Sequence, residues 1–437
     1  MPVTPRIAMI APFIAPLLSD EPVPGGGGAE RQMALIARGL AQRGWDVHVL
    51  LRDAPRGRPT PGLRTWVVPF RYLGGPKRHL LPDLLALRRT LRQVRPDIIG
   101  IRNGGPYITA SLIAHRWITR TPFVVWLQSD HDILPGVFYP NERSFAQRLP
   151  ARAYKFSLRF ADLLIAQTER QWQIAARVGR DAILIRNIAG MPRSDARPSP
   201  APTCPPGYVL WAGSLAPNKR PALLRAVARL APELRFMAAA NGTNAEALAR
   251  FGAQFQGLPN VKFLGAVPPA DMEAWFAGTG CLLNTSAEEG FPNTFLQAWQ
   301  YGAPVVTAGV DPDGVITAHG LGLVSPVRDE SEAEVRALAA SLSPLLSDDA
   351  LRESVAAKAR QYIADHHSQD ANLSALDRVL RQTIAARTNT RRSLRPQKGT
   401  EGTRSGFRRR EREEPQRTAR KHQEKPEIIP PTTPTRG

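Results

Sequence analysis

Short apolar segments alternate with longer stretches of helical periodicity through about the first 385 residues of the chain. This alternation is typical of parallel β-sheets covered by helices, because strands buried on both faces read as continuous apolar runs. Each half of the chain supplies one series of such segments. In the first half the predicted strands are 6–11, 46–51, 65–69, 97–101, 123–128, 163–166 and 182–185. In the second half they are 208–212, 234–239, 261–264, 281–284, 304–307 and 321–324.

A proline-rich segment separates the two halves. Residues 191–207, MPRSDARPSPAPTCPPG, contain six prolines and no apolar periodicity, which is typical of an interdomain linker. We therefore predict an α/β fold in which two Rossmann-like domains face each other across a cleft. The predicted parts are 1–190 for the N-terminal domain, 191–207 for the linker, 208–365 for the C-terminal domain, 366–386 for a last helix that can cross back to the N-terminal domain, and 387–437 for a disordered basic tail.

The most informative segment for function is 284–306, NTSAEEGFPNTFLQAWQYGAPVV. A predicted strand leads into a loop with Glu288 and Glu289, and Pro292 then opens an apolar-periodic helix. A helix N-terminus presents unpaired backbone N–H groups and favours an anion, whereas a nearby carboxylate can bind sugar hydroxyls. The segment therefore predicts a site for a ligand that carries both phosphate and hydroxyl groups. Of the two carboxylates we favour Glu289 and expect Glu288 to face solvent.

Four consecutive glycines, Gly25 to Gly28, stand directly before another predicted helix. A glycine loop before a helix lets the backbone approach a phosphate closely, although a flexible surface loop is the alternative interpretation. The loop is not the dinucleotide-binding fingerprint, because the glycines are consecutive and follow the first strand by about fourteen residues.

Two cations, Lys219 and Arg220, follow the strand 208–212 in the run GSLAPNKR, which also contains Ser214. Cations at the carboxyl end of a strand suit a diphosphate leaving group, whose charge grows in the transition state. Solvated side chains are the alternative, but cations near a helix N-terminus are unfavourable by about 0.3–1 kcal/mol. Gln297, two turns into the helix after the Glu289 loop, is a further candidate, with a surface glutamine as the alternative.

Candidates for acid–base chemistry are few. His131 and Asp132 follow the strand 123–128 in the run QSDHDI, where catalytic groups of an open sheet are found. The alternative is that this pair caps a turn.

The formal net charge of the chain is +20, and it is unevenly distributed. Residues 387–437 hold 15 Lys and Arg against 6 Asp and Glu, with almost no apolar periodicity. Such a segment cannot bury enough surface to offset the entropy of ordering, so we predict a disordered, solvated tail. Contact with an anionic membrane surface is the alternative. Nucleic-acid binding is disfavoured, because no aromatic residues interleave the arginines.

Residues 77–97 combine an apolar helical stripe with six Lys and Arg. They predict a core-facing helix with a solvated basic face; resting on an anionic bilayer is the alternative, which would suit a lipid-carried acceptor. No run of about 18 apolar residues is present, which argues against a transmembrane helix. Cys204 and Cys281 are the only cysteines and lack metal-type spacing. We therefore expect a reducing, cytoplasmic setting and no metal site.

At these residues the chain resembles the retaining glycosyltransferase family four, which has the two-domain GT-B architecture. Family members carry a Glu, then Gly-Phe-Pro, a second Glu eight positions after the first, and Gly-x-Pro-Val-Val. The residues that match are Glu289, Gly290, Phe291, Pro292, Gly302, Pro304, Val305 and Val306. The runs GGAER at 27–31, ADLLIAQTE at 161–169 and NVKFLG at 260–265, with Lys219, agree independently. The resemblance spans about residues 6–386.

The resemblance implies a nucleotide-diphosphate sugar in the cleft, no metal or other cofactor, and transfer of a hexose to a glycan or lipid-linked acceptor. Glu289 would contact the sugar hydroxyls, and the backbone amides of Asn293 and Thr294 would face the diphosphate. The implied catalytic residues are Glu289, His131 and Asp132, and the implied donor-binding residues are Gly27, Gly28, Ser214, Lys219, Arg220, Gly290, Phe291, Pro292, Asn293, Thr294 and Gln297. The expected role is synthesis of a cell-surface polysaccharide or lipopolysaccharide, in the cytoplasm or peripherally on the inner face of the membrane.

Three positions depart from the family pattern. Gln297 replaces the second Glu, which would hydrogen-bond the ribose, and Ser214 replaces an arginine that many members place beside the diphosphate. Gln128 stands where a catalytic-type histidine is expected, with His131 three residues further on. A non-catalytic nucleotide-sugar-binding protein is therefore one alternative. A nucleotide-sugar epimerase of the same architecture is another.

Overall fold

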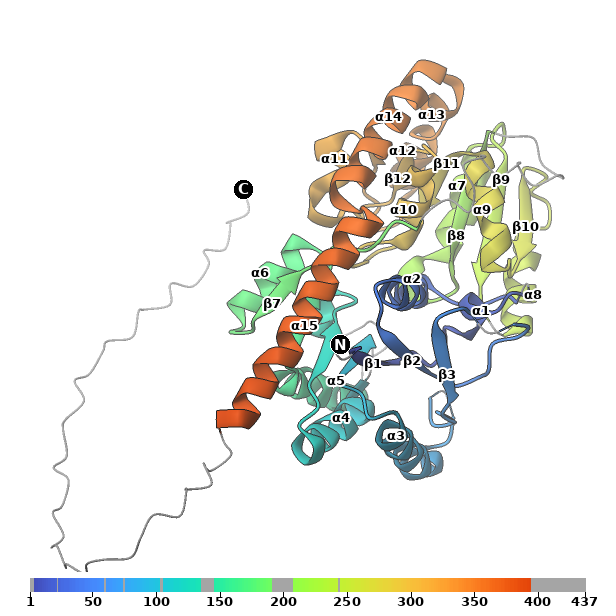
Figure 1. Cartoon of the computed structure of the whole chain (residues 1–437). Coiled ribbons are helices and arrows are strands. Elements are labelled where there is room, and N and C mark those ends of the chain that lie inside the picture. The colour runs from blue at the N-terminus through green and yellow to red at the C-terminus, as the bar shows by residue number, and fades with distance from the viewer. Residues whose placement is uncertain are drawn as a thin grey trace, which may run out of the picture. The chain divides into compact units, whose positions relative to one another are not determined.

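The computed structural model describes residues 4–21, 23–58, 60–73, 75–102, 105–134, 145–190, 207–242 and 244–393. Most of the predicted linker and the basic tail beyond residue 393 lie outside the described residues. The chain divides into two compact units, Met1–Arg392 and Ser393–Gly437, and the fold below is that of the first unit. It consists of two parallel sheets with helices, as predicted, which we call the N-terminal and C-terminal lobes (Figure 1).

The N-terminal lobe is built on a seven-stranded parallel sheet with the order β3-β2-β1-β4-β5-β6-β7. Its strands are β1 (Arg6–Ile10), β2 (Asp46–Leu51), β3 (Leu63–Val67), β4 (Ile98–Arg102), β5 (Phe123–Trp126), β6 (Leu163–Ala166) and β7 (Ala182–Leu184). Its helices are α1 (Ala15–Leu18), α2 (Gly28–Gln42), α3 (Leu80–Val94), α4 (Gly105–Thr119), α5 (Phe145–Ser157) and α6 (Glu169–Arg177). Alternate residues of β1 enter two different apolar cores: Met9 packs with Met33 of α2, whereas Ile10 packs with Leu87 of α3.

The C-terminal lobe has a six-stranded parallel sheet with the order β10-β9-β8-β11-β12-β13. Its strands are β8 (Tyr208–Ser214), β9 (Phe236–Asn241), β10 (Val261–Gly265), β11 (Thr279–Asn284), β12 (Val305–Thr307) and β13 (Gly322–Val324). Its helices are α7 (Pro221–Leu230), α8 (Ala245–Ala253), α9 (Pro269–Gly278), α10 (Asn293–Gln300), α11 (Val315–His319), α12 (Glu332–Ala340), α13 (Ser343–Ser347) and α14 (Asp349–His366). All thirteen predicted strands are therefore present in the two sheets, with ends that differ by up to two residues.

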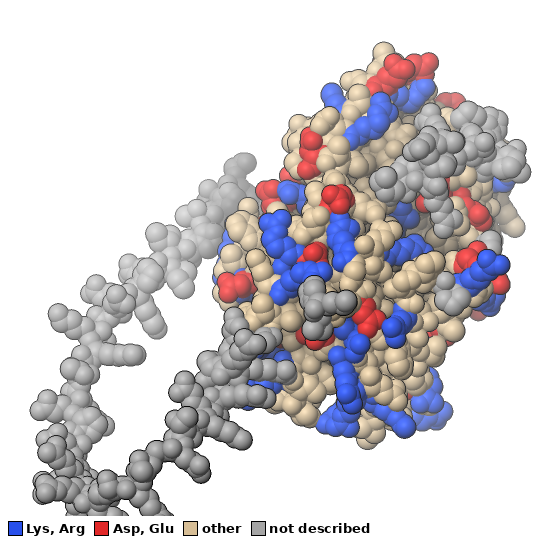
Figure 2. All heavy atoms as spheres, in the orientation of Figure 1, with Lys and Arg blue, Asp and Glu red and all other residues tan. Residues whose placement is uncertain are grey.

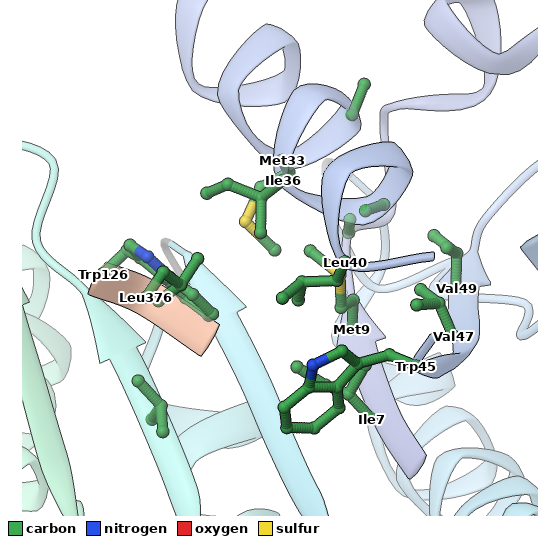
Figure 3. Packing of buried hydrophobic residues seen from close by; sticks show 14 of the residues in the cluster. Ile7, Met9, Met33, Ile36, Leu40, Trp45, Val47, Val49, Trp126 and Leu376 are labelled. Carbon is green, nitrogen blue, oxygen red and sulfur yellow. The ribbon is translucent and has the colours of Figure 1, made fainter. Parts of the chain in front are cut away.

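The last helix, α15 (Gln369–Ser393), returns to the N-terminal lobe. Its Leu373, Leu376 and Leu380 are buried in the core that also contains Met33 and Leu40 of α2 (Figure 3). Burial of one leucine side chain contributes about 1.5–3 kcal/mol, so this apolar stripe attaches the helix firmly.

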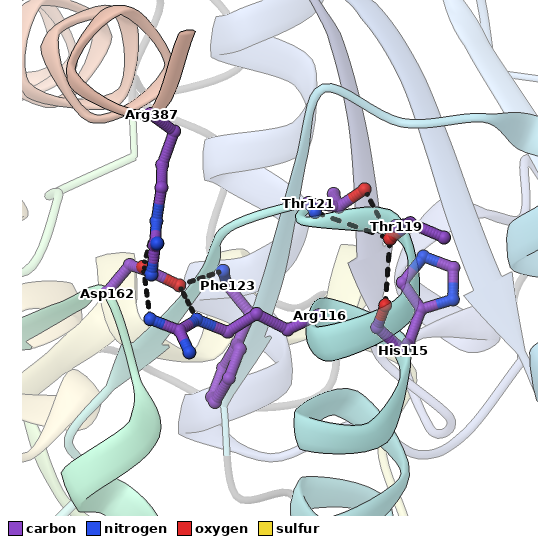
Figure 4. Close-up of polar contacts among 7 residues, drawn as sticks. All are labelled: His115, Arg116, Thr119, Thr121, Phe123, Asp162 and Arg387. Carbon is purple, nitrogen blue, oxygen red and sulfur yellow. Dashed lines mark hydrogen bonds and ion pairs between the residues drawn. The ribbon is translucent and has the colours of Figure 1, made fainter. Parts of the chain in front are cut away.

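A buried carboxylate fixes the far end of α15. Arg387 donates to Asp162 through Nε at 2.7 Å, and Arg116 binds the same carboxylate at 2.9 and 3.1 Å (Figure 4). The predicted start of the tail at residue 387 is therefore too early, because the helix continues to Ser393. The apolar spacing ends earlier than the helix, and the Arg387–Asp162 ion pair holds the turn that follows the apolar stripe.

Candidate functional site

Each sheet reverses its strand order at one point, and both points face one cavity. In the C-terminal lobe the order changes between β8 and β11, and the loops after these strands carry Lys219 and Glu289. In the N-terminal lobe it changes between β1 and β4, and the chain after β1 leads to Gly27. Ligands of open α/β sheets bind at such points, beyond the carboxyl ends of the strands. The topology thus brings predicted residues from both halves to one place.

The cavity between these loops has a volume of about 1060 Å³. Ligand pockets typically measure 300–1,000 Å³, so this one has room for a ligand larger than a single sugar. The predicted residues that line it are Gly27, Gly28, His131, Ser214, Lys219, Glu289, Gly290, Phe291, Pro292, Asn293, Thr294 and Gln297. Asp132 and Arg220 are not among the lining residues.

Glu289 is held by two partners from the C-terminal lobe. It forms an ion pair with Lys219, and the Ser286 hydroxyl donates to it at 2.8 Å. Both contacts involve Oε1, and the side chain is 15% exposed. The second oxygen, Oε2, is therefore left to accept hydrogen bonds from a ligand. A fixed carboxylate with one oxygen engaged is well suited to bind hydroxyl groups.

Helix α10 begins at the cavity without a side-chain cap. Pro292 is its N-cap residue, and within the described part of the chain no side-chain cap bonds its first turn. The amides of Asn293 and Thr294 are therefore free to bind an anion, which this helix end stabilises by about 0.3–1 kcal/mol. Gln297, one turn later, lines the same cavity.

Two glycines allow the lobes to approach each other closely. A Cβ atom on Gly28 would lie 2.7 Å from Asn293 Nδ2, and one on Gly290 would lie 2.1 Å from the carbonyl oxygen of Gln128. Next to these contacts, Gln32 of α2 donates to Asn293 Oδ1 at 2.6 Å. At Gly290 a side chain would meet a backbone carbonyl that cannot move aside, so glycine is required there, whereas at Gly28 the close contact is with the Asn293 side chain.

His131 and Asp132 have different surroundings, although they are adjacent in a 3-10 turn (Asp130–Asp132). His131 lines the cavity, with Nε2 3.2 Å from Glu288 Oε2. Asp132 is buried and accepts hydrogen bonds from the backbone amides of Gln128 and Ser129 at 2.6 and 3.2 Å. Burial raises the pKa of its carboxyl group. The structure thus gives Asp132 turn-capping contacts and leaves it outside the cavity lining, whereas its catalytic role stays a prediction.

Arg220 also departs from its predicted place. It has a φ of 45°, and its guanidinium donates to the carbonyl oxygens of Thr285, Ser286, Ala308 and Val327. This network binds together the loops after β8, β11 and β12, and burial lowers the pKa of the side chain. Arg220 therefore supports the loops around the site from behind and does not line the cavity.

Sequence reasoning missed several polar residues of the cavity. Arg102, at the end of β4, donates to Gln167 Oε1 at 2.9 Å, and Gln167 Nε2 donates to the Gln128 carbonyl at 2.5 Å. Arg102 and Gln167 lie at or just after the carboxyl ends of strands, as do the residues that were predicted. The same rule applied to every strand would have found them.

Within the described ranges, no group of three or more His, Cys, Asp or Glu side chains could hold a metal ion. None of the helices described in the structure combines the length and apolar character needed to cross a membrane.

Comparison with protein-family models finds two matches. The "Glycosyl transferase 4-like domain" matches residues 27–189, and "Glycosyl transferases group 1" matches residues 206–348. Together they cover both lobes. Among curated protein sequences, none matches this chain.

Several solved structures share the fold. Sucrose-phosphate synthase from Thermosynechococcus elongatus has a TM-score of 0.69 at 18% identity, covering 87% of this chain and 100% of its own. Anabaena Alr3699/HepE in complex with UDP-glucose has a TM-score of 0.61 at 18% identity, covering 86% and 99%. WaaG, a glycosyltransferase involved in lipopolysaccharide biosynthesis, has a TM-score of 0.60 at 15% identity, covering 84% and 99%. At these identities the likeness is one of fold.

Proposed function

The chain belongs to the group 1 glycosyltransferases of family four, and we propose that its cleft binds a nucleotide-diphosphate sugar. From this donor a hexose passes to a hydroxyl group of a glycan or glycolipid, with retention of configuration at the anomeric carbon. The observation that carries the proposal is the Lys219–Glu289 pair beside the uncapped start of α10, in a cavity that both lobes line. A cation and free amides suit a diphosphate, and a carboxylate suits sugar hydroxyls. The Anabaena structure with UDP-glucose supports the same ligand class.

Stabilisation of the leaving diphosphate is the main catalytic contribution that we assign to the C-terminal lobe. Negative charge grows on the diphosphate as the bond to the sugar breaks, and preorganised donors at that place lower the barrier. Lys219 and the amides of Asn293 and Thr294 would provide them, and the Gly27–Gly28 loop would close over the phosphates from the other lobe. We propose that these groups replace a metal ion, so a chelator such as EDTA should leave the activity unchanged.

Glu289 would orient the sugar ring. Its Oε1 already contacts Lys219 and Ser286, so that one carboxylate oxygen is held in place and the other faces a ligand. We therefore assign Glu289 to hydrogen bonding of the hexose hydroxyls. His131 would contact the same sugar from the N-terminal lobe.

The surface of the N-terminal lobe supports a membrane-associated acceptor and peripheral binding to an anionic membrane. Leu81 and Leu85 of α3 and Trp117 of α4 are 67, 56 and 66% exposed. Lysine and arginine side chains gather at the lower end of the molecule in Figure 2, where α3 and α4 lie in Figure 1. Apolar residues beside cations are the combination that binds an anionic bilayer. The enzyme would then act at the cytoplasmic face on a precursor of a cell-surface polysaccharide or lipopolysaccharide.

The proposal is tested by titrating the protein with a panel of UDP-, GDP- and ADP-sugars and measuring heat release, donor hydrolysis and the anomeric configuration of any product. We expect one nucleotide to bind in the micromolar range and Glu289→Gln to lower turnover by about 100-fold, as for loss of one transition-state hydrogen bond. Glu288→Gln, the matched control, should lower it less than tenfold. No binding by any nucleotide sugar would refute the proposal, and an epimerised sugar formed without acceptor would replace it.

A further inference from the structure

One cationic side chain that lines the cavity, Arg102, is not used by the proposed donor site. Arg102 ends β4, which lies beside β1 at the reversal point of the N-terminal sheet. Its side chain is 92% buried yet lines the cavity. One terminal nitrogen donates to Gln167 Oε1 at 2.9 Å, whereas Nε is buried without any hydrogen-bond partner.

Arg102 also lacks a directly paired counterion among the described residues. In the part of the chain that the structure describes, no carboxylate forms an ion pair with it. Glu30 and Asp132 are the acidic side chains that act on it from a distance, but each is engaged elsewhere: Glu30 accepts from the Gly27 amide, and Asp132 from the Gln128 and Ser129 amides. Burial lowers the pKa of Arg102 to about 10, so it is cationic at neutral pH. A buried charge without a partner is strongly unfavourable, and an anionic ligand would relieve the cost.

The position of Arg102 brings it close to the loop that we assign to the sugar. Lys219 and the start of α10 belong to the C-terminal lobe, whereas Arg102 belongs to the N-terminal sheet. Gln167 connects Arg102 to the Glu289 loop, because a Cβ atom on Gly290 would lie only 2.3 Å from Gln167 Nε2. Asn187 strengthens the connection by donating to Gln167 Oε1 at 2.8 Å and to the Phe291 carbonyl at 3.3 Å.

We propose that Arg102 binds an oxyanion of the acceptor, so that the acceptor of this enzyme carries a phosphate or carboxylate group close to the hydroxyl that is glycosylated. The inference rests on the proposed function, since it places the acceptor on the N-terminal side of a donor sugar held by Glu289. The guanidinium would anchor the acceptor and position its hydroxyl against the anomeric carbon. Arg102 would thereby determine acceptor specificity and would contribute little to donor affinity.

The test titrates glucose 6-phosphate, glucuronate and neutral glucose into the protein, with and without the nucleoside diphosphate identified by the donor panel. We expect at least one anionic sugar to bind the wild type and glucose not to bind. Arg102→Gln should weaken the anionic sugar by about 10- to 100-fold, as expected for loss of a charge-assisted hydrogen bond, and leave nucleotide affinity within about twofold. Binding of glucose 6-phosphate would indicate an acceptor that carries a phosphate, and binding of glucuronate one that carries a carboxylate.

Two further variants complete the test. Arg102→Lys keeps the charge and should recover part of the anion affinity. Arg170→Gln removes another arginine that lines the cavity but is paired with Asp130, and it should leave anion affinity within about twofold. Equal anion binding by wild type and Arg102→Gln, or no anion binding by the wild type, would overturn the proposal. Loss of nucleotide affinity in Arg102→Gln would assign the residue to the donor instead. Anion binding without any nucleotide binding would contradict the proposed function but keep the subsite.

Discussion

Replacing Gly290 with alanine tests whether the contact between the two lobes seen here is the arrangement that binds the donor. The backbone of Gly290 does not have a positive φ, so alanine fits its local conformation. Its Cβ atom, however, would lie 2.1 Å from the Gln128 carbonyl oxygen and 2.3 Å from Gln167 Nε2, both in the opposite lobe. Gln167 can rotate away, but the backbone carbonyl cannot, so the clash is relieved only when the lobes separate.

The size of the effect follows from the cost of overpacking. Inserting one methyl group into a packed contact costs about 1–3 kcal/mol. If separation of the lobes relieves the clash, this free energy disfavours the closed arrangement. Because about 1.4 kcal/mol corresponds to a factor of ten, the ratio of closed to open molecules falls by about 5- to 150-fold. The apparent affinity for a donor that touches both lobes should fall by up to the same factor.

Calorimetric titration with the donor and steady-state turnover measure this loss, and thermal unfolding reports whether each lobe still folds. We expect unfolding to change little, because the substituted atom faces the cleft and not a core. Gly242→Ala is the matched control, since its Cβ atom would meet only Leu248 at an ordinary 3.8 Å. Unchanged donor affinity and turnover in Gly290→Ala would show that the lobes do not need this contact, and would refute the reasoning.

Three further predictions follow from groups outside the cleft. Burial lowers the pKa of His367 to about 3. Below pH 6.5 this imidazole therefore becomes protonated in the unfolded chain but stays neutral in the folded protein. Stability should therefore fall by up to about 1.4 kcal/mol per pH unit between pH 6.5 and 3, and His367→Gln should flatten this slope in urea unfolding. Arg387→Ala should lower the free energy of unfolding by about 0.5–1.5 kcal/mol in the same assay, a modest loss because Asp162 keeps Arg116 as a partner. An unchanged free energy of unfolding would show that this bond does not hold the end of α15. A chain truncated after residue 393 should still sediment with anionic but not zwitterionic vesicles, and failure to do so would move the membrane contact to the tail.

The strands could be predicted from the sequence because most are buried on both faces and therefore read as apolar runs. Their ends are less predictable, since pairing with neighbours determines them. The third strand was expected at 65–69, but the structure pairs Leu63–Val67 with β2. That strand lies at the edge of the sheet and is partly exposed, so its hydrophobic pattern is weak.

The sequence predicts those site residues whose role follows from their place directly after a strand. It predicts less well those whose role depends on the direction in which the side chain points. Lys219 and Glu289 are seventy residues apart, yet both follow strands that are adjacent in the sheet, and the structure joins them in an ion pair. Arg220 follows the same strand, but its left-handed backbone turns the side chain toward backbone carbonyls, which no spacing rule indicates. Arg102 was overlooked because it ends an apolar run in which it reads as the flank of a buried strand.

The contacts that hold the two lobes together are of two kinds, which differ in the free energy needed to break them. At the cleft they include polar contacts: Gln32 binds Asn293, the Asp313 carboxylate accepts from the Glu169 and Arg170 amides at 2.8 and 3.0 Å, and glycines permit the close approach. Across α15 the attachment is an apolar core. Polar contacts exchange with water at small net cost, whereas an apolar core does not. Separating the lobes at the cleft would therefore break contacts of small net cost and would leave the apolar attachment of α15 to the N-terminal lobe intact.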